Sequence, residues 1–274
     1  MPTGRICSGF DGYCLRIPED RGGKNEDQKH ISLFVHGYNN GWEDSVKRYM
    51  TLKSKLYSGP GSLGALVLFS WPSNDAVYGY LPDREDARAS GPELAKMLVS
   101  LHNVLLTNQH LALKDKAKPC KAKISIIAHS MGNYVIQKAL AIASRQLNNP
   151  QLITLVHQLV MVAADVDNDI FQKHQPAESD GSLMANLCYR ITALYTGKDQ
   201  VLGASAGLKH FGTRRLGRSG LAGRADVYDN VCDIDISDII TGEKDTHSEA
   251  LDEEEPLALI RDILRGVDRS LLNQ

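Results

Sequence analysis

Short apolar runs alternate along the chain with longer segments in which apolar residues recur every three or four positions. Six runs rich in β-branched and aromatic residues are typical of strands, and they cover residues 31–36, 65–69, 124–128, 158–164, 190–195 and 231–236. Because these runs are almost continuously apolar rather than alternating, they predict parallel strands that are buried on both faces.

Helical periodicity fills the segments between these runs. We expect helices over residues 42–56, from Pro92 through Leu105, after Gly132, and from Pro256 through Leu271. Strands that alternate with helices indicate an α/β fold, with a mainly parallel central sheet and helices on both faces. No internal repeat or linker interrupts the pattern, so we predict a single domain over residues 1–274 with a peripheral N-terminal segment, residues 1–30.

Composition narrows the class of protein. Apolar residues make up 42% of the chain and charged residues 23%, which is ordinary globular usage and excludes disorder over the whole length. The 31 basic and 33 acidic residues leave a net charge of -2. That balance argues against nucleic acid as a partner, because phosphate binding needs a concentrated basic surface.

No transmembrane segment is expected, because no run of 18 apolar residues occurs, and the first residues do not read as a signal peptide. The five scattered cysteines, Cys7, Cys14, Cys120, Cys188 and Cys232, form neither a disulfide framework nor the close pairs of a zinc site. We therefore predict a reduced, cytoplasmic protein without metal or cofactor. A Cys7–Cys14 disulfide in an exported protein is the alternative.

The third apolar run leads directly into Ala128-His129-Ser130-Met131-Gly132, and helical periodicity follows. A sharp turn from strand to helix strains the backbone at the serine and projects its hydroxyl, and it requires small residues two positions before and after. Ala128 and Gly132 meet that requirement. The pattern predicts that Ser130 is a nucleophile.

A serine hydroxyl needs an imidazole to accept its proton, and that imidazole needs a carboxylate to orient it. We favour His247, which lies between the last strand and the terminal helix, over His210, His157 and His174. For the acid we favour Asp199, which directly follows the fifth strand. Asp165 or Asp167, after the fourth strand, are the alternative acids and could otherwise belong to a weak calcium-binding cluster.

The first strand ends in a His-Gly turn that can present backbone N–H groups to the serine. We expect the N–H groups of Tyr38 and Met131 to form an oxyanion hole, with His36 bracing the loop.

Four motifs occur in order: His36-Gly37-Tyr38-Asn39-Asn40, Phe69-Ser70-Trp71-Pro72-Ser73, Ala128-His129-Ser130-Met131-Gly132-Asn133 and Ala164-Asp165-Val166-Asp167. Together they resemble the bacterial α/β-hydrolases of unknown function, a group similar to lipases and esterases, over residues 29–248. The resemblance implies an α/β-hydrolase fold with Ser130, Asp199 and His247 as the catalytic residues and the same two oxyanion donors. Ala128 replaces the usual first glycine of the elbow. The resemblance names no substrate.

Two further sets of residues could bind substrate. Trp71 and Tyr80 follow the second strand and could line an acyl pocket, although Trp71 could equally be a core residue. Four arginines lie on a glycine-rich loop and could bind a phosphate or carboxylate, or could simply be solvated: Arg214, Arg215, Arg218 and Arg224.

These features predict a serine hydrolase that cleaves a small-molecule carboxylic ester through an acyl-enzyme. Little sequence separates the fourth and fifth strands, which favours a small lid and short or soluble acyl groups. The alternatives are an amidase, peptidase or thioesterase that uses the same residues, or a binding module that has kept the fold and lost turnover. The oligomeric state is not predicted.

Overall fold

A computed structural model describes residues 30–74, 79–114, 122–147, 154–209, 212–242 and 245–272 of the chain. Apart from His30, the N-terminal segment predicted to be peripheral lies outside the described residues. So do Cys7, Cys14 and Cys120, and therefore the possible Cys7–Cys14 disulfide. The remaining cysteines, Cys188 and Cys232, are both free thiols.

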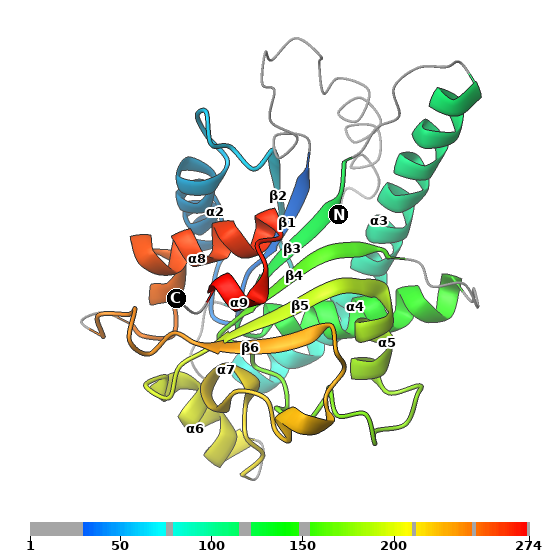
Figure 1. The fold of residues 1–274 in the computed structure, drawn as a ribbon. Coiled ribbons are helices and arrows are strands. Elements are labelled where there is room, and N and C mark those ends of the chain that lie inside the picture. Colours follow the sequence, from blue (N-terminus) through cyan, green and yellow to red (C-terminus); the bar gives the residue numbers. More distant parts are fainter. Residues whose placement is uncertain are drawn as a thin grey trace.

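The six predicted strands are confirmed and form one parallel sheet (Figure 1). They are β1 (Ile31–Val35), β2 (Ala65–Phe69), β3 (Ile124–His129), β4 (Val156–Val162), β5 (Cys188–Tyr195) and β6 (Val231–Asp235). Their order across the sheet is β2-β1-β3-β4-β5-β6, and every neighbouring pair is parallel. From β1 the chain first winds outward to β2 and then crosses back to β3, so the strand order reverses beside β1. In open α/β sheets, ligands bind at the carboxyl ends of the strands at such a reversal.

Helices cover both faces of this sheet (Figure 1). The α-helices are α2 (Trp42–Leu56), α3 (Tyr80–Lys114), α4 (Gly132–Leu147), α5 (Asp180–Leu187), α6 (Gln200–Lys209), α7 (Leu216–Ser219), α8 (Glu254–Arg265) and α9 (Arg269–Leu272). Two short 3-10 helices are η3 (Arg224–Asp226) and η4 (Glu249–Leu251).

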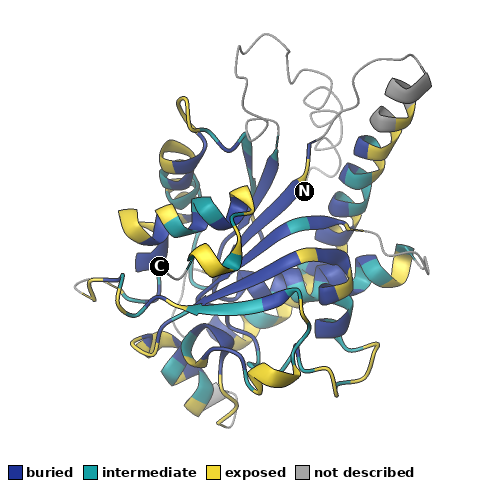
Figure 2. Cartoon of the chain, in the orientation of Figure 1, coloured by how far each residue is buried: buried dark blue, intermediate teal, exposed yellow. Residues whose placement is uncertain are grey.

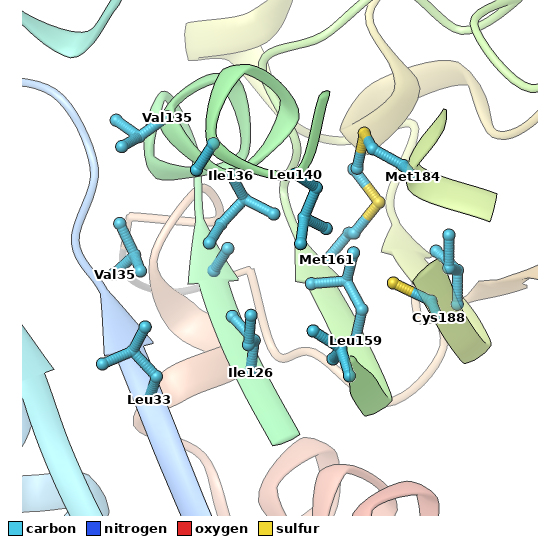
Figure 3. Close-up of a cluster of buried hydrophobic side chains, with 14 of the residues drawn as sticks. Leu33, Val35, Ile126, Val135, Ile136, Leu140, Leu159, Met161, Met184 and Cys188 are labelled. Carbon is cyan, nitrogen blue, oxygen red and sulfur yellow. The ribbon is translucent and has the colours of Figure 1, made fainter. Parts of the chain in front are cut away.

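Alternation along the strands divides the core into two clusters. On β3, Ile124, Ile126 and Ala128 face the cluster that α3, α4 and α5 cover, whereas Ile127 faces the cluster beneath α2 and α8. Figure 2 shows the strands as the buried interior, with exposed residues on the outer sides of the helices. Figure 3 shows the first cluster, where Val135, Ile136 and Leu140 of α4 lie over the side chains of the strands.

Two helix boundaries differ from the sequence prediction. Helix α3 begins at Tyr80, twelve residues before Pro92, so this proline lies inside the helix instead of starting it. The first turns of α3 are highly charged and carry little apolar periodicity, although Tyr80 and Ala87 are buried. Helix α8 ends at Arg265, because Gly266 adopts a left-handed conformation with φ 82° and stops the helix before Leu271.

Candidate active site

Ser130 sits on a sharp turn between β3 and α4. Its φ angle is 52°, in the left-handed region that L-residues other than Asn and Asp seldom occupy. The turn is held on both sides: the Ser130 N–H donates to the Val162 carbonyl at 3.0 Å, and the Ser130 carbonyl accepts from the Asp165 N–H at 3.2 Å. Asn133 adds a side-chain N–H bond of 3.1 Å to the same carbonyl. The strained turn predicted from the sequence is thus present.

His247 lies within hydrogen-bonding distance of this serine. The loop after β6 carries it to the carboxyl edge of the sheet, where its Nε2 is 2.8 Å from the Ser130 Oγ. Its Nδ1 lies 2.7 Å from Oδ2 of Asp199. A carboxylate can only accept here, so Nδ1 carries the proton, and Nε2 of the neutral ring is left to accept from the serine hydroxyl.

Asp199 directly follows β5 and precedes α6, and it is fully buried. Its Oδ1 accepts the Leu202 N–H at 2.9 Å, which caps the first turn of α6, while Oδ2 faces His247. Because each oxygen has its own donor, the carboxylate is fixed toward the imidazole. The Arg218 guanidinium holds the Asp199 main-chain carbonyl as well.

The environment of His247 sets its basicity. Burial by itself would lower the pKa of His247, but the hydrogen bond and negative charge of Asp199 outweigh burial and raise this pKa above its ordinary value. Asp245 and Asp165 add smaller contributions in the same direction. The arrangement therefore favours an imidazole that takes up a proton readily.

The other residues considered for these positions lie elsewhere. His210 is outside the described residues. His157 is the second residue of β4, and its ring stacks on Tyr189 with centroids 5.1 Å apart. His174 bonds to Asp226 at 2.9 Å.

The alternative acids are engaged in a different contact. Asp165 Oδ1 accepts from Arg215 Nε at 2.8 Å, and Asp167 pairs with the same guanidinium. Among the described contacts, neither carboxylate bonds to His247.

The loop after β1 lies directly against Ser130. A Cβ atom placed on Gly37 would come within 2.7 Å of the Ser130 Cβ, so only glycine allows this approach. Within the part of the chain that the structure describes, the Met131 N–H has no acceptor, and Met131 is fully buried. Tyr38 follows Gly37 on the same loop. The two predicted oxyanion donors thus come from the two segments that meet at the serine.

His36 braces this loop, as expected. Its Nδ1–H donates to the Gly37 carbonyl at 2.9 Å, and its Nε2 accepts the Trp71 N–H at 3.2 Å. The Trp71 ring stacks on His36 with centroids 5.2 Å apart, and its Nε1–H donates to the His36 carbonyl at 2.8 Å.

Trp71 and Tyr80, predicted to bind substrate, lie inside the core. Their exposed fractions are 3% and 4%. The Tyr80 hydroxyl donates to Asp165 Oδ2 at 2.6 Å, and its ring meets Tyr38 edge-on at 5.4 Å between centroids. These contacts are those of core residues that support the site, and they do not support direct substrate binding.

The arginine-rich loop also differs from both sequence interpretations. Arg215 is fully buried in its pair with Asp165, Arg218 holds the Asp199 carbonyl, and Arg224 pairs with Asp233 at 2.8 Å. Arg214 and Arg224 are both exposed, so exposure on this loop does not exclude an ion pair. Three of the four guanidinium groups therefore hold the loop in place.

Sequence reasoning missed two buried polar residues beside the site. Asp83 accepts from the Ser73 hydroxyl at 2.6 Å and the Asn74 N–H at 2.9 Å, which fixes the loop after β2. His129 lies 4% exposed beside His247. No periodicity identifies Asp83, whereas the alternation of side chains along β3 could have placed His129.

The described residues contain neither a metal-binding cluster nor a membrane-spanning helix. No group of three or more His, Cys, Asp or Glu residues there is arranged to hold a metal ion. None of the helices in the described ranges combines the length and apolar character needed to cross a membrane.

A family model and one curated relative match the sequence of this chain. A family model described as "Alpha/beta hydrolase of unknown function" (DUF900) matches residues 21–255. An uncharacterized protein of Nostoc sp., alr1448, is 30% identical over 134 residues, which is 41% of this chain and 31% of that protein. The chain thus spans about a third of the length of this curated relative.

Solved structures show a more distant likeness. Aspergillus fumigatus lipase B matches with a TM-score of 0.48 and 12% identity, over 94% of this chain and 59% of the lipase. A Pyrobaculum calidifontis esterase matches with a TM-score of 0.40 and 13% identity, over 88% of this chain and 78% of the esterase. At these identities and TM-scores the likeness assigns no activity.

Proposed function

The chain belongs to the family of α/β-hydrolases of unknown function, and from that premise we propose that it is a serine hydrolase that cleaves a carboxylic ester through an acyl-enzyme. The observation that carries the proposal is the continuous hydrogen-bonded chain from Asp199 through His247 to Ser130, with links of 2.7 and 2.8 Å. It ends at a serine held in a strained turn, where the hydroxyl projects from the backbone.

In the first half-reaction, the Ser130 Oγ attacks the ester carbonyl carbon while His247 Nε2 takes the hydroxyl proton. The carbonyl oxygen becomes negative and accepts from the N–H groups of Met131 and Tyr38. When the tetrahedral intermediate collapses, the carbon–alkoxide bond breaks, and the His247 imidazolium gives its proton to the departing alcohol. Ser130 is left acylated.

In the second half-reaction, water attacks the acyl carbon and gives a proton to His247. The bond between the acyl carbon and the Ser130 Oγ then breaks, and Oγ takes the proton back, so a carboxylic acid leaves and the serine is restored. Asp199 remains ionised throughout, where it holds the Nδ1–H tautomer and stabilises the imidazolium. Water is the only co-reactant that these steps require.

Hydrolysis of p-nitrophenyl esters from acetate to palmitate tests the proposal. Ser130→Ala removes the nucleophile, and we expect activity to fall at least about 1,000-fold. Ser58→Ala, at an exposed serine whose hydroxyl donates to the Lys53 carbonyl, is the matched control and retains wild-type activity.

A fluorophosphonate probe supplies a readout that does not depend on choosing the right ester. Labelling of the wild type and not of Ser130→Ala supports a live serine nucleophile. Labelling without ester hydrolysis would favour an amide, peptide or thioester substrate. A wild-type protein that neither labels nor turns over any ester would overturn the proposal in favour of a binding module.

Acyl-chain preference is the finer part of the proposal. Between β4 and β5 the structure contains only one helix, α5 of eight residues, which favours a small lid and short or soluble acyl groups. Hydrolysis that becomes faster with long-chain, micellar esters would contradict this preference.

A further inference from the structure

His129 lies on the same side of the sheet as the loop that carries His247. Ile127 belongs to the cluster beneath α2 and α8, and side chains two residues apart on a strand share a face. His129, the last residue of β3, therefore points to that side. The loop that carries His247 enters from the same side, between β6 and α8.

One hydrogen bond joins the two histidines. His129 Nε2 lies 2.9 Å from the main-chain carbonyl of His247, and the ring centroids are 4.9 Å apart. A carbonyl can only accept, so His129 Nε2 carries a proton and donates it. Burial, and then the charges of His247 and of Arg48 on α2, hold the pKa of His129 well below its ordinary value, with His36 adding to this effect.

Within the segment that carries His247, Asp245 accepts the His247 N–H on its side chain at 3.2 Å and the Ser248 N–H on its carbonyl at 3.0 Å. This segment is a turn rather than a strand or α-helix. Arg48 donates to the Ser248 carbonyl at 3.3 Å in a partly buried contact, and the Thr246 hydroxyl donates to the Lys198 carbonyl at 3.3 Å in an exposed contact. Among these contacts to the turn, the bond from His129 is the buried one, and it comes from the residue adjacent to Ser130.

We propose that His129 is a positioning residue, whose imidazole fixes the main chain of His247 and so sets the distances of the His247 ring from Ser130 and Asp199. The inference rests on the proposed function, because it concerns the same base. His129 and Ser130 are consecutive residues. The hydrogen bond from His129 therefore holds the main chain of the base at a fixed place relative to the nucleophile. An uncharged ring also avoids repulsion when His247 becomes an imidazolium.

Two substitutions separate this role from simple packing. In His129→Gln, the side-chain amide nitrogen reaches about as far as Nε2 and can still donate to the His247 carbonyl. In His129→Asn, the amide nitrogen reaches only as far as Nδ1 and cannot. Asn lacks one methylene of Gln, so a role in packing alone would lower the stability of His129→Asn more than that of His129→Gln, but it would leave the pH profile and the His247 Nδ1–H signal alike in the two variants. His174→Gln and His174→Asn, at an exposed histidine, are the matched controls.

We expect His129→Asn to lower kcat about 10-fold or more with KM nearly unchanged, because a small displacement of a catalytic group is costly whereas ester binding is unaffected. His129→Gln should recover most of the loss. The acid limb of the pH profile should move to lower pH in His129→Asn, since a displaced ring interacts less with Asp199. Thermal unfolding of each variant shows whether it is folded.

The nuclear magnetic resonance signal of the His247 Nδ1–H proton gives a readout without turnover. It should persist in the wild type and His129→Gln and broaden or disappear in His129→Asn. Equal kcat, pH profile and proton signal in both variants would overturn the positioning role, while probe labelling of Ser130 left the hydrolase proposal intact. A wild type that neither labels nor hydrolyses would overturn the hydrolase proposal, and the proton signal would still test His129.

Discussion

Both ring nitrogens of His247 and its main-chain carbonyl oxygen are engaged at the same time. Asp199 follows β5, whereas His129 and Ser130 are consecutive residues at the end of β3. The ring can therefore move toward one partner only at the expense of another. A general base needs this restraint if it is to pass one proton between two oxygens without turning its ring.

Asp199→Asn tests the electrostatic part of that constraint. The base must be neutral to accept a proton, so activity falls as pH drops through the pKa of His247. Asp199 raises this pKa against the effect of burial. Without the carboxylate the effect of burial remains, so we expect the acid limb of kcat/KM to move to lower pH, and the plateau to fall about 1,000-fold or more because the Nδ1–H tautomer is no longer held.

The measurement is kcat/KM against pH for wild type and variant. Asp226→Asn, which alters an exposed aspartate that faces His174, serves as the control and should leave the profile unchanged. An acid limb that stays in place in Asp199→Asn would mean that the carboxylate does not set the basicity of His247.

At the scale of elements, the start of α4 is pressed against the end of β1. A Cβ atom on Gly132 would lie 2.5 Å from the His36 carbonyl oxygen and 2.6 Å from that of Val35. Both are backbone atoms of the strand end that carries the oxyanion loop, so neither can move aside without shifting the site. The glycine two residues after the serine thus sets the separation between nucleophile and oxyanion donors.

Gly132→Ala should consequently reduce stability and activity together. We expect the free energy of unfolding to fall by about 1–3 kcal/mol from overpacking, and probe labelling of Ser130 to slow markedly. Gly207→Ala in α6 is the matched control, because a Cβ there meets nothing within 4 Å and alanine favours a helix. Urea unfolding and labelling rates measure both effects; wild-type values for Gly132→Ala would contradict the close approach.

At the scale of the whole molecule, the parallel sheet explains what could be predicted from the sequence. Ser130, Asp199 and His247 each follow an apolar run, and the carboxyl ends of parallel strands share one edge, so their proximity follows from strand patterning alone. Burial of Arg215 could not be predicted, because a charged residue on a glycine-rich loop resembles a solvated one until its partner Asp165, fifty residues earlier, is known. The catalytic roles of Ser130, Asp199 and His247 stay predictions.

That buried pair joins segments that are distant in the sequence. Asp165 follows β4 and Arg215 precedes α7, while the first residue of α3, Tyr80, and Ser205 of α6 donate to the same carboxylate at 2.6 and 3.2 Å. The loop after β4, the loop before α7 and the helices α3 and α6 therefore meet at one ion pair. A fully buried charge without its partner is strongly destabilising, whereas an exposed pair contributes little.

Arg215→Ala should accordingly lower the free energy of unfolding by about 3 kcal/mol, since it removes the nearer cation of the buried Asp165 and leaves Arg84 at 3.8 Å. Arg224→Ala should cost less than Arg215→Ala, because Arg224 is 59% exposed and its 7%-exposed partner Asp233 keeps the Leu221 N–H at 2.8 Å. Urea unfolding compares the two. Replacing both partners, Asp165→Asn with Arg215→Met, should cost less than Arg215→Ala alone, because the charges that lose a partner, Asp167 and Arg84, are not fully buried. If Arg215→Ala costs no more than Arg224→Ala, the ion pair does not hold these four elements together.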